Sequence, residues 1–474
     1  MLEVEMRKNN LIILFLFLLF LLTACVTDPN PAPVGNGDTD MSGSVYLLAI
    51  NDTHGAFYSE GNYPGLDRVA GLLEELEEKN GKYVKIAVGD IFQGSYISNI
   101  HYGLPLLRAL NAMEFDAFVI GNHEFDWGLD KIARYADGDP ENGEADFPFL
   151  AANIVCEGKK LDWTEDYVIV EREGFKIGII GVIGYGLESS IAADKVGGYA
   201  FLDPVPIVRD LAAELRSEHS CDIVIVANHD YSLNFYLHVA AFPEESYVDA
   251  VICGHTHQLV NKKEMREDEF FMPVIQSDDK NETAGEIAFK FNKEGKLYSA
   301  TARHYEPSRY QAGAAVAALV EEYASDIAAG ERVVGYTPEI LYKPRIGEEM
   351  VFAMASKYQA DVAIINTGGV REILARGPIR VKDVYEVFPF DNAVILTDIG
   401  GWQLKELYDE QKQFLYLSEF DFDDIDEYET YRVAIIDYVY NQSYYRDYFT
   451  GFEPEETHDL MRDIFIEFLE EFYQ

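Results

Sequence analysis

Five short segments of the chain combine glycine or asparagine with aspartate or histidine. They are Asn51-Asp52-Thr53-His54, Gly89-Asp90, Gly121-Asn122-His123-Glu124, Asn228-His229 and Gly254-His255-Thr256-His257. Carboxylate or amide oxygens together with imidazole nitrogens suit borderline divalent ions such as Mn²⁺, Zn²⁺ or Fe²⁺ better than Ca²⁺. Alternate residues of an extended segment point to the same side, so Asp52 with His54, and His255 with His257, could each offer two donors to one site. The pattern therefore predicts a metal centre.

Any one of these segments alone would more often be a helix cap or a turn in which glycine supplies a positive φ. Each of the five, however, follows a short β-branched run that has the pattern of a buried strand. These runs are 45–50, 84–88, 116–120, 222–227 and 248–253. In α/β sheets, ligands bind beyond the carboxyl ends of the strands, where loops from several strands converge. Groups that are two hundred residues apart in sequence are therefore expected to meet.

The domain organisation follows from the order of these runs. Strand runs alternate with helical stretches, such as 66–78 and 205–216, which predicts an α/β domain. An alanine-rich stretch over 312–329, bounded by Gly330, predicts one helix that leads to a second α/β unit, whose clearest strand is 361–366. We expect a first domain over 44–305, a linker helix over 306–330 and a second domain over 331–474.

The N-terminus has the pattern of a secretory signal. Arg7 and Lys8 precede an apolar run of twelve residues, 11–22, which as a helix would span only about 18 Å and is too short to cross a bilayer. Residues 22–25, which end in Cys25, resemble the lipobox of bacterial lipoproteins. We therefore expect a signal peptide over 1–24, lipidation of Cys25 and a Pro/Gly-rich tether over 25–43. These features predict a lipid-anchored, extracytoplasmic protein of the bacterial cell envelope.

Composition restricts the partners. The chain of 474 residues carries a formal charge of −45, which argues against a nucleic-acid partner because such binding needs a basic surface. A small anionic substrate would need a local source of positive charge. Residues 371–382, with four basic side chains against one acidic, could supply it beside the expected metal ions.

The order of the metal-type segments resembles the calcineurin-like metallophosphoesterases. Two longer matches, Gly121-Asn122-His123-Glu124-Phe125-Asp126 and Gly89-Asp90 with Gln93-Gly94, are similar to their 5′-nucleotidase and 2′,3′-cyclic phosphodiesterase family. In the second unit, the segment 366–371 resembles that family's Asn-Gly-Gly-Gly-Ile-Arg loop, and Pro389-Phe390 with Asn392 resembles its Pro-Phe-x-Asn turn. The resemblance implies a two-sheet metallophosphoesterase sandwich, joined by a helix to a smaller α/β C-terminal domain of the 5′-nucleotidase type.

The resemblance also implies a centre of two divalent ions. One ion would be held by Asp52, His54, Asp90 and His257, and the other by Asp90, Asn122, His229 and His255. Two ions about 4 Å apart can share a hydroxide and position it for in-line attack on phosphorus. His123 would stabilise the transition state or protonate the leaving group, and Asp126 would orient it.

Substrate-binding residues are implied in the second domain. They are Asn366, Gly368, Gly369, Arg371, Phe390 and, as a second stacking aromatic, Tyr445, for which Tyr444 is the alternative. The alternatives are a surface salt bridge from Arg371 to Glu372 or Asp383, and ordinary core packing for Phe390. Two departures from the family are that only Lys343 and Arg345 could replace its upstream arginines, and that residues 441–445 lack its glycine loop.

The predicted function is removal of phosphate from nucleotides outside the cytoplasm. The alternatives within the same fold are hydrolysis of cyclic nucleotides, nucleotide sugars or a non-nucleotide anion. A surface lipoprotein that binds without catalysis is a further alternative, although a pure binder has no need of the complete set of metal-type residues. The sequence leaves the native metal and the oligomeric state open.

Overall fold

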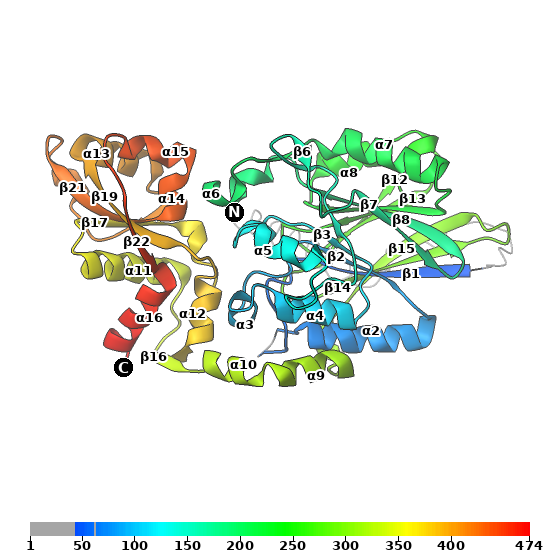
Figure 1. The fold of residues 1–474 in the computed structure, drawn as a ribbon, viewed down its shortest axis with the longest axis horizontal. Coiled ribbons are helices and arrows are strands. Elements are labelled where there is room, and N and C mark those ends of the chain that lie inside the picture. The colour runs from blue at the N-terminus through cyan, green and yellow to red at the C-terminus, as the bar shows by residue number, and fades with distance from the viewer. Residues whose placement is uncertain (1–42, 61–62) are drawn as a thin grey trace, which may run out of the picture. The chain divides into compact units, whose positions relative to one another are not determined.

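The computed structural model describes residues 43–60 and 63–474. The expected signal peptide, Cys25 and all but the last residue of the expected tether lie outside the described residues. None of the helices in the described part of the chain has both the length and the apolar character needed to cross a bilayer. Figure 1 shows the first domain in blue to green and the second in yellow to red.

The first domain contains two six-stranded sheets (Figure 1). The first sheet has the order β15-β14-β1-β2-β3-β4. Its strands are β1 (Gly43–Ile50), β2 (Val84–Val88), β3 (Ala117–Val119), β4 (Phe149–Leu150), β14 (Ala284–Phe291) and β15 (Leu297–Tyr305). The strands β1 to β4 are parallel, whereas β14 is antiparallel to β1. The carboxyl ends of the parallel strands therefore meet at one edge.

The second sheet has the order β12-β13-β11-β10-β8-β7. Its strands are β7 (Tyr167–Arg172), β8 (Phe175–Ile183), β10 (Ile223–His229), β11 (Ala250–Cys253), β12 (Val260–Met265) and β13 (Phe271–Gln276). The four inner strands are parallel, and the two edge strands run against them. A small sheet of β5 (Ile154–Cys156), β6 (Lys159–Lys160) and β9 (Tyr199–Phe201) completes the domain.

Alternation along β1 explains how the layers pack. Val45, Leu47 and Ala49 point into a core shared with the second sheet, whereas Leu48 and Ile50 point into a core formed with helices. The helices are α2 (Leu66–Asn80), α3 (Tyr96–Asn99), α4 (Leu104–Ala112), α5 (Asp130–Ala133), α6 (Ala193–Val196), α7 (Pro204–Ser217) and α8 (Leu233–Ala240). Helices α7 and α8 share a core with the outer face of the second sheet. The predicted two-sheet sandwich is confirmed.

The linker is two helices rather than the single helix expected over 312–329. They are α9 (Ala314–Glu322) and α10 (Ala324–Gly330). Between them, Tyr323 adopts φ −89° and ψ 8°. Its buried ring packs edge-on against Phe57 and His101, with centroid distances of 5.7 Å and 5.2 Å. These contacts with the first domain interrupt the helix, and the local alanine pattern contains no information about them.

The second domain is built on a five-stranded sheet with the order β20-β17-β21-β19-β22. Its strands are β17 (Val362–Asn366), β19 (Ala393–Gly400), β20 (Leu415–Leu417), β21 (Thr430–Ile436) and β22 (Glu455–Leu460), with β16 (Val333–Thr337) and β18 (Gly377–Arg380) as a separate pair. Its helices are α11 (Lys343–Tyr358), α12 (Val381–Val387), α13 (Gly401–Gln411), α14 (Asp437–Asn441), α15 (Ser443–Arg446) and α16 (Met461–Phe472). A single hydrophobic core includes residues from β17, β19, β20 and β21 of this sheet, but none from β22. The predicted smaller α/β domain is confirmed.

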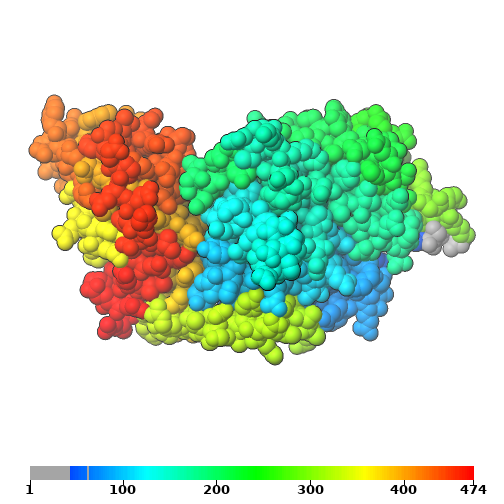
Figure 2. Space-filling view, viewed as in Figure 1, coloured from blue at the N-terminus to red at the C-terminus, as the bar shows by residue number. Residues whose placement is uncertain are grey.

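Contacts between side chains join the second domain to the first. Lys280–Glu372 and Lys382–Glu60 form ion pairs, and Asn99 and Gln442 donate hydrogen bonds to the carbonyl oxygens of Pro389 and Ile191. The short helix α6 of the first domain lies beside α14 of the second (Figure 1), and Figure 2 shows the green and orange surfaces meeting there. The loops that carry the expected metal and substrate residues are therefore brought together.

Candidate active site

A first cluster of metal-type side chains consists of Asp52, His54 and His257, whose ligand atoms lie within 4.8 Å of one another. Asp52 and His54 follow β1, and His257 follows β11. The Nε2 atom of His257 lies 3.4 Å from Oδ1 of Asp52 and 3.0 Å from Nε2 of His54. Three donors that converge in this way fit a divalent cation.

A second cluster consists of Asp90, His229 and His255. The side-chain oxygen of Asn122 lies 3.2 Å from Nε2 of His229 and 2.9 Å from Nδ1 of His255. Oδ2 of Asp90 lies 3.1 Å from Nε2 of His229, but it forms no hydrogen bond within the described part of the chain. A buried carboxylate oxygen left open among imidazole nitrogens also fits a divalent cation. The protein thus offers sites for two divalent metal ions.

Five of the seven expected ligands have a left-handed backbone. The φ angles are 49° for Asp52, 47° for His54, 55° for Asp90, 75° for His255 and 53° for His257. This conformation costs about 1–2 kcal/mol for each residue other than glycine, and such strain gathers at functional sites. The expectation that these pairs present two donors to one site from an extended segment was therefore wrong for His255 and His257, which belong to different clusters. Asp52 and His54 do belong to one cluster, but through a left-handed turn.

Hydrogen bonds on the far sides of the rings orient the histidines. Nδ1 of His229 lies 2.8 Å from the carbonyl oxygen of Val88, and Nδ1 of His54 lies 3.3 Å from that of Gln93. A ring that donates there presents the lone pair of Nε2 to the cluster. Burial holds the pKa of His54 well below its usual range and lowers the pKa of His255 to about 4. Both rings are therefore neutral at pH 7, as metal ligation requires.

Glu124 is a buried residue that sequence reasoning left without a role. Its carboxylate accepts hydrogen bonds from the backbone N–H groups of Asp90, Ile91 and Gly121, at 2.8, 3.0 and 2.8 Å. It thereby joins the loops that follow β2 and β3 and fixes the position of Asp90. A Cβ atom on Gly121 would lie 2.3 Å from Oδ1 of Asp90, so this position requires glycine. The only signal in the sequence was the position of Glu124 beside His123.

His123 lies outside both clusters and is paired with Asp126. Its Nδ1 atom lies 2.7 Å from Oδ2 of Asp126, and its ring stacks on Phe390 at a centroid distance of 5.8 Å. Burial acts to lower the pKa of His123, but the carboxylates of Asp126 and Asp90 outweigh it and raise the pKa above its usual value. The ring can therefore carry a proton near neutral pH.

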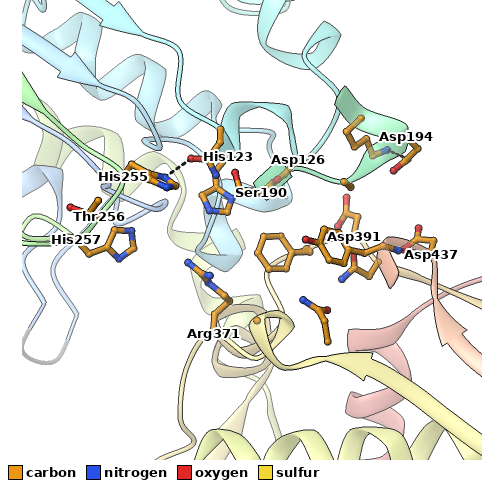
Figure 3. A pocket seen from close by; sticks show the side chains of 18 residues that line it. His123, Asp126, Ser190, Asp194, His255, Thr256, His257, Arg371, Asp391 and Asp437 are labelled. Carbon is orange, nitrogen blue, oxygen red and sulfur yellow. Dashed lines mark hydrogen bonds and ion pairs between the residues drawn. The ribbon is translucent and has the colours of Figure 1, made fainter. Parts of the chain in front are cut away.

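One pocket of about 440 Å³ contains residues of both domains (Figure 3). From the first domain it is lined by Asn122, His123, Asp126, His255 and His257, and from the second by Asn366, Gly368, Arg371 and Phe390. These are nine of the residues expected to form the site. In Figure 3, His255 and His257 lie at one end and Arg371 faces the space beside His123.

The alternatives considered for Arg371 and Phe390 do not hold. Glu372 pairs with Lys280 instead, and no ion pair in the described part of the chain involves Arg371. The Arg371 guanidinium lies 5.9 Å from the ring centroid of Phe390. Phe390 is half-buried and lines the pocket, so it is not an ordinary core residue.

Asn366 and Gly369 lie next to each other at the end of β17. The buried Oδ1 of Asn366 has no hydrogen-bond partner in the described part of the chain, although the residue lines the pocket. A Cβ atom on Gly369 would lie 2.9 Å from that oxygen. Gly369 is buried and does not line the pocket, so its contribution is to leave room for Asn366.

The structure does not bring Tyr445 to the pocket. Its ring is only 3% exposed and belongs to the core of the second domain, because the segment after β21 forms α14 and α15, and Tyr445 on α15 is turned inward. Tyr438 on α14 lines the pocket instead. The spacing of the tyrosines in this region gives no signal that distinguishes the two. Arg345 also lies elsewhere, paired with Glu349 at 2.8 Å.

Comparisons with known proteins agree with this geometry. Residues 45–259 match the calcineurin-like phosphoesterase family, and residues 345–438 match the 5′-nucleotidase C-terminal domain. The chain is 24% identical over 407 residues to endonuclease YhcR of Bacillus subtilis (strain 168), with 77% of this chain but only 32% of that protein covered. It therefore spans about a third of that relative.

Two further proteins match the chain over most of their length. A 5′-nucleotidase of Vibrio cholerae is 24% identical over 440 residues, with 81% of this chain and 77% of that protein covered. The crystal structure of a 5′-nucleotidase precursor from Thermus thermophilus has a TM-score of 0.74 at 20% identity, covering 91% of this chain and 97% of that one. This chain joins a calcineurin-like phosphoesterase domain to a 5′-nucleotidase C-terminal domain, and both are domains of hydrolases that act on phosphoric esters.

Proposed function

We propose that this protein removes the phosphate group from nucleotides. The observation that supports the proposal most directly is the shared pocket, in which His123 and the metal-type histidines of the first domain face Asn366, Arg371 and Phe390 of the second. One end of the pocket has the groups that phosphoryl transfer needs, and the other has an aromatic ring and polar groups that suit a nucleoside.

Different residues of the chain have different roles in the proposed hydrolysis. Two divalent ions, one held by Asp52, His54 and His257 and the other by Asp90, Asn122, His229 and His255, would activate water for attack on phosphorus and supply positive charge for the phosphoryl oxygens. His123 donates a proton or a hydrogen bond to the leaving-group oxygen, and Asp126 holds its ring in the required orientation. Arg371, which has no carboxylate partner among the described residues, balances the charge of the phosphate.

The second domain holds the nucleoside. Phe390 and Tyr438 both line the pocket and offer rings against which a base can stack. Asn366, with its open side-chain oxygen, accepts a hydrogen bond from the base or the sugar. The Gly368 backbone allows the substrate to approach closely.

We also propose that the enzyme acts outside the cytoplasm as a lipid-anchored protein. The apolar run 11–22 followed by Cys25 supports this location. Expressed in a bacterial host, the full chain is expected to partition with membranes and to carry acyl groups on Cys25. The Cys25→Ala variant should appear in the soluble fraction with its N-terminus unacylated by mass spectrometry. If Cys25→Ala partitions with membranes to the same extent as the parent, the proposed lipid anchor at Cys25 is refuted.

The activity is tested with a panel of phosphate esters. With Mn²⁺, the mature protein is expected to release phosphate from AMP and from p-nitrophenyl phosphate, and to lose both activities when a chelator removes the metal. Cyclic nucleotides and a nucleotide sugar are assayed alongside. If a cyclic nucleotide or the nucleotide sugar is hydrolysed faster than AMP, that compound is the preferred substrate class. If no ester is hydrolysed although metal is bound, the protein binds its ligand without catalysis.

A further inference from the structure

The end of the pocket away from the metal clusters carries charged groups from both domains. Asp194 and Lys195 come from α6 of the first domain, and Asp437 comes from α14 of the second. In Figure 3, Asp194 and Asp437 lie together on the side opposite His255 and His257. A substrate whose phosphate lies at the metal clusters would therefore place its leaving group near these charges.

The charges at this end are not equivalent. Nζ of Lys195 lies 3.5 Å from Oδ2 of Asp194, and both side chains are substantially exposed. Asp391, which also lines the pocket, is paired with Arg462. Asp437 differs from both because no ion pair in the described part of the chain includes it, and because its partners are the backbone N–H groups of Tyr438, at 2.7 Å, and Ala393.

Two backbone N–H bonds leave acceptor capacity on the carboxylate of Asp437, which can take up to about four hydrogen bonds. Burial raises its pKa to about 6, so the group still carries a negative charge at pH 7. A half-buried anion with free lone pairs attracts neutral O–H and N–H donors and repels phosphate. The pair of Asp194 and Lys195 at the same end of the pocket has no net charge. It therefore does not offset the repulsion between Asp437 and phosphate.

We propose that Asp437 selects the leaving group: it accepts hydrogen bonds from the hydroxyl or amino groups of an uncharged nucleoside and rejects one that carries a second phosphate. The proposal rests on the proposed function and narrows it to phosphate monoesters of neutral leaving groups. A position that depends on such a hydrogen bond discriminates between leaving groups, because an unsuitable group covers the half-buried carboxylate without offering a donor to its remaining lone pairs.

The test compares Asp437→Asn with the parent enzyme on three substrates. Asparagine keeps the acceptor for the N–H group of Tyr438 but removes the charge. For AMP, kcat/KM should fall about tenfold, as expected for the loss of a hydrogen bond to a charged group. For adenosine 3′,5′-bisphosphate it should rise about tenfold as repulsion is relieved. Hydrolysis of p-nitrophenyl phosphate, whose leaving group lacks these donors, should change less than about twofold.

Asp409→Asn is the matched control, because Asp409 is exposed on α13 and does not line the pocket, and it should leave the preference for AMP over the bisphosphate unchanged. The same preference in Asp437→Asn and in the parent would overturn the inference alone. A parent enzyme that hydrolyses p-nitrophenyl phosphate but no nucleotide would overturn both the inference and the nucleotide assignment. A parent that hydrolyses neither would overturn the proposed function itself.

Discussion

Replacement of His123 by alanine is expected to lower kcat for AMP by about 10²- to 10⁴-fold, the usual range for loss of a general acid. The content of metal should stay at two ions per chain, because the ring of His123 belongs to neither cluster and its Nδ1 atom is engaged by Asp126 at 2.7 Å. Steady-state kinetics and metal analysis on the same purified variant measure both quantities.

The choice of leaving group shows what His123 does. A nucleoside alkoxide needs a proton as it departs, whereas p-nitrophenolate leaves readily without one. His123→Ala should therefore lose far less activity on p-nitrophenyl phosphate than on AMP. His238, exposed on α8 and absent from the pocket lining, provides the matched control, and His238→Ala should behave like the parent. Loss of a metal ion would refute the assignment, and equal losses on both substrates would indicate transition-state stabilisation rather than proton donation.

Asp126→Asn extends this prediction to pH. The carboxylate of Asp126 helps to raise the pKa of His123 against the effect of burial. A proton donor is active below its pKa and loses activity as the pH rises through it. Because the variant lacks the charge that stabilises the protonated ring, the alkaline limb of the kcat profile for AMP should move to lower pH. An alkaline limb at the parent's pH would contradict the role of Asp126.

The strand-end residues could be located from the sequence because their signal is local. Each expected ligand follows a buried β-branched run, and parallel strands carry such residues to one edge of a sheet. The alternation of residues along an extended segment could not show that His255 and His257 divide between two clusters, although the family resemblance implied that division. That division depends on left-handed backbone conformations, which are imposed by the packing of loops from different strands. One example is the backbone N–H of His255, which donates to both oxygens of Asp52, 203 residues away.

The second domain was harder to predict at the level of single residues. The segment after β21 was expected to present Tyr445, but its helices present Tyr438 and bury Tyr445. A tyrosine is equally suited to a core or to a pocket, so burial depends on how α14 packs against the sheet and α6. The sequence also provided no reason to select Asp437. Nothing in its sequence context distinguishes it from the other acidic residues of this acidic chain.

A second large effect is expected from Asp90→Asn. Asp90 lies in the second cluster, and its charge also reaches the first, since it opposes the lowering of the pKa of both His54 and His255. Without this anion the centre should bind fewer than two ions per chain. Because bound metal contributes several kcal/mol to the stabilisation of the transition state, turnover should fall at least about a thousandfold for both AMP and p-nitrophenyl phosphate.

The expected loss of turnover and of bound metal in Asp90→Asn must be distinguished from misfolding and from general electrostatic effects. Asparagine keeps an oxygen that can accept the backbone N–H group of His123, as Oδ1 of Asp90 does at 2.8 Å, so the fold should persist by circular dichroism. Asp279→Asn provides a graded control, because Oδ2 of Asp279 lies 3.5 Å from Nδ1 of His257 while Asp279 itself belongs to neither cluster. It should weaken metal binding by about 10- to 100-fold without changing the stoichiometry at saturating Mn²⁺. A folded Asp90→Asn variant that binds two ions and retains turnover within tenfold of the parent would exclude Asp90 as the bridge between the metal sites.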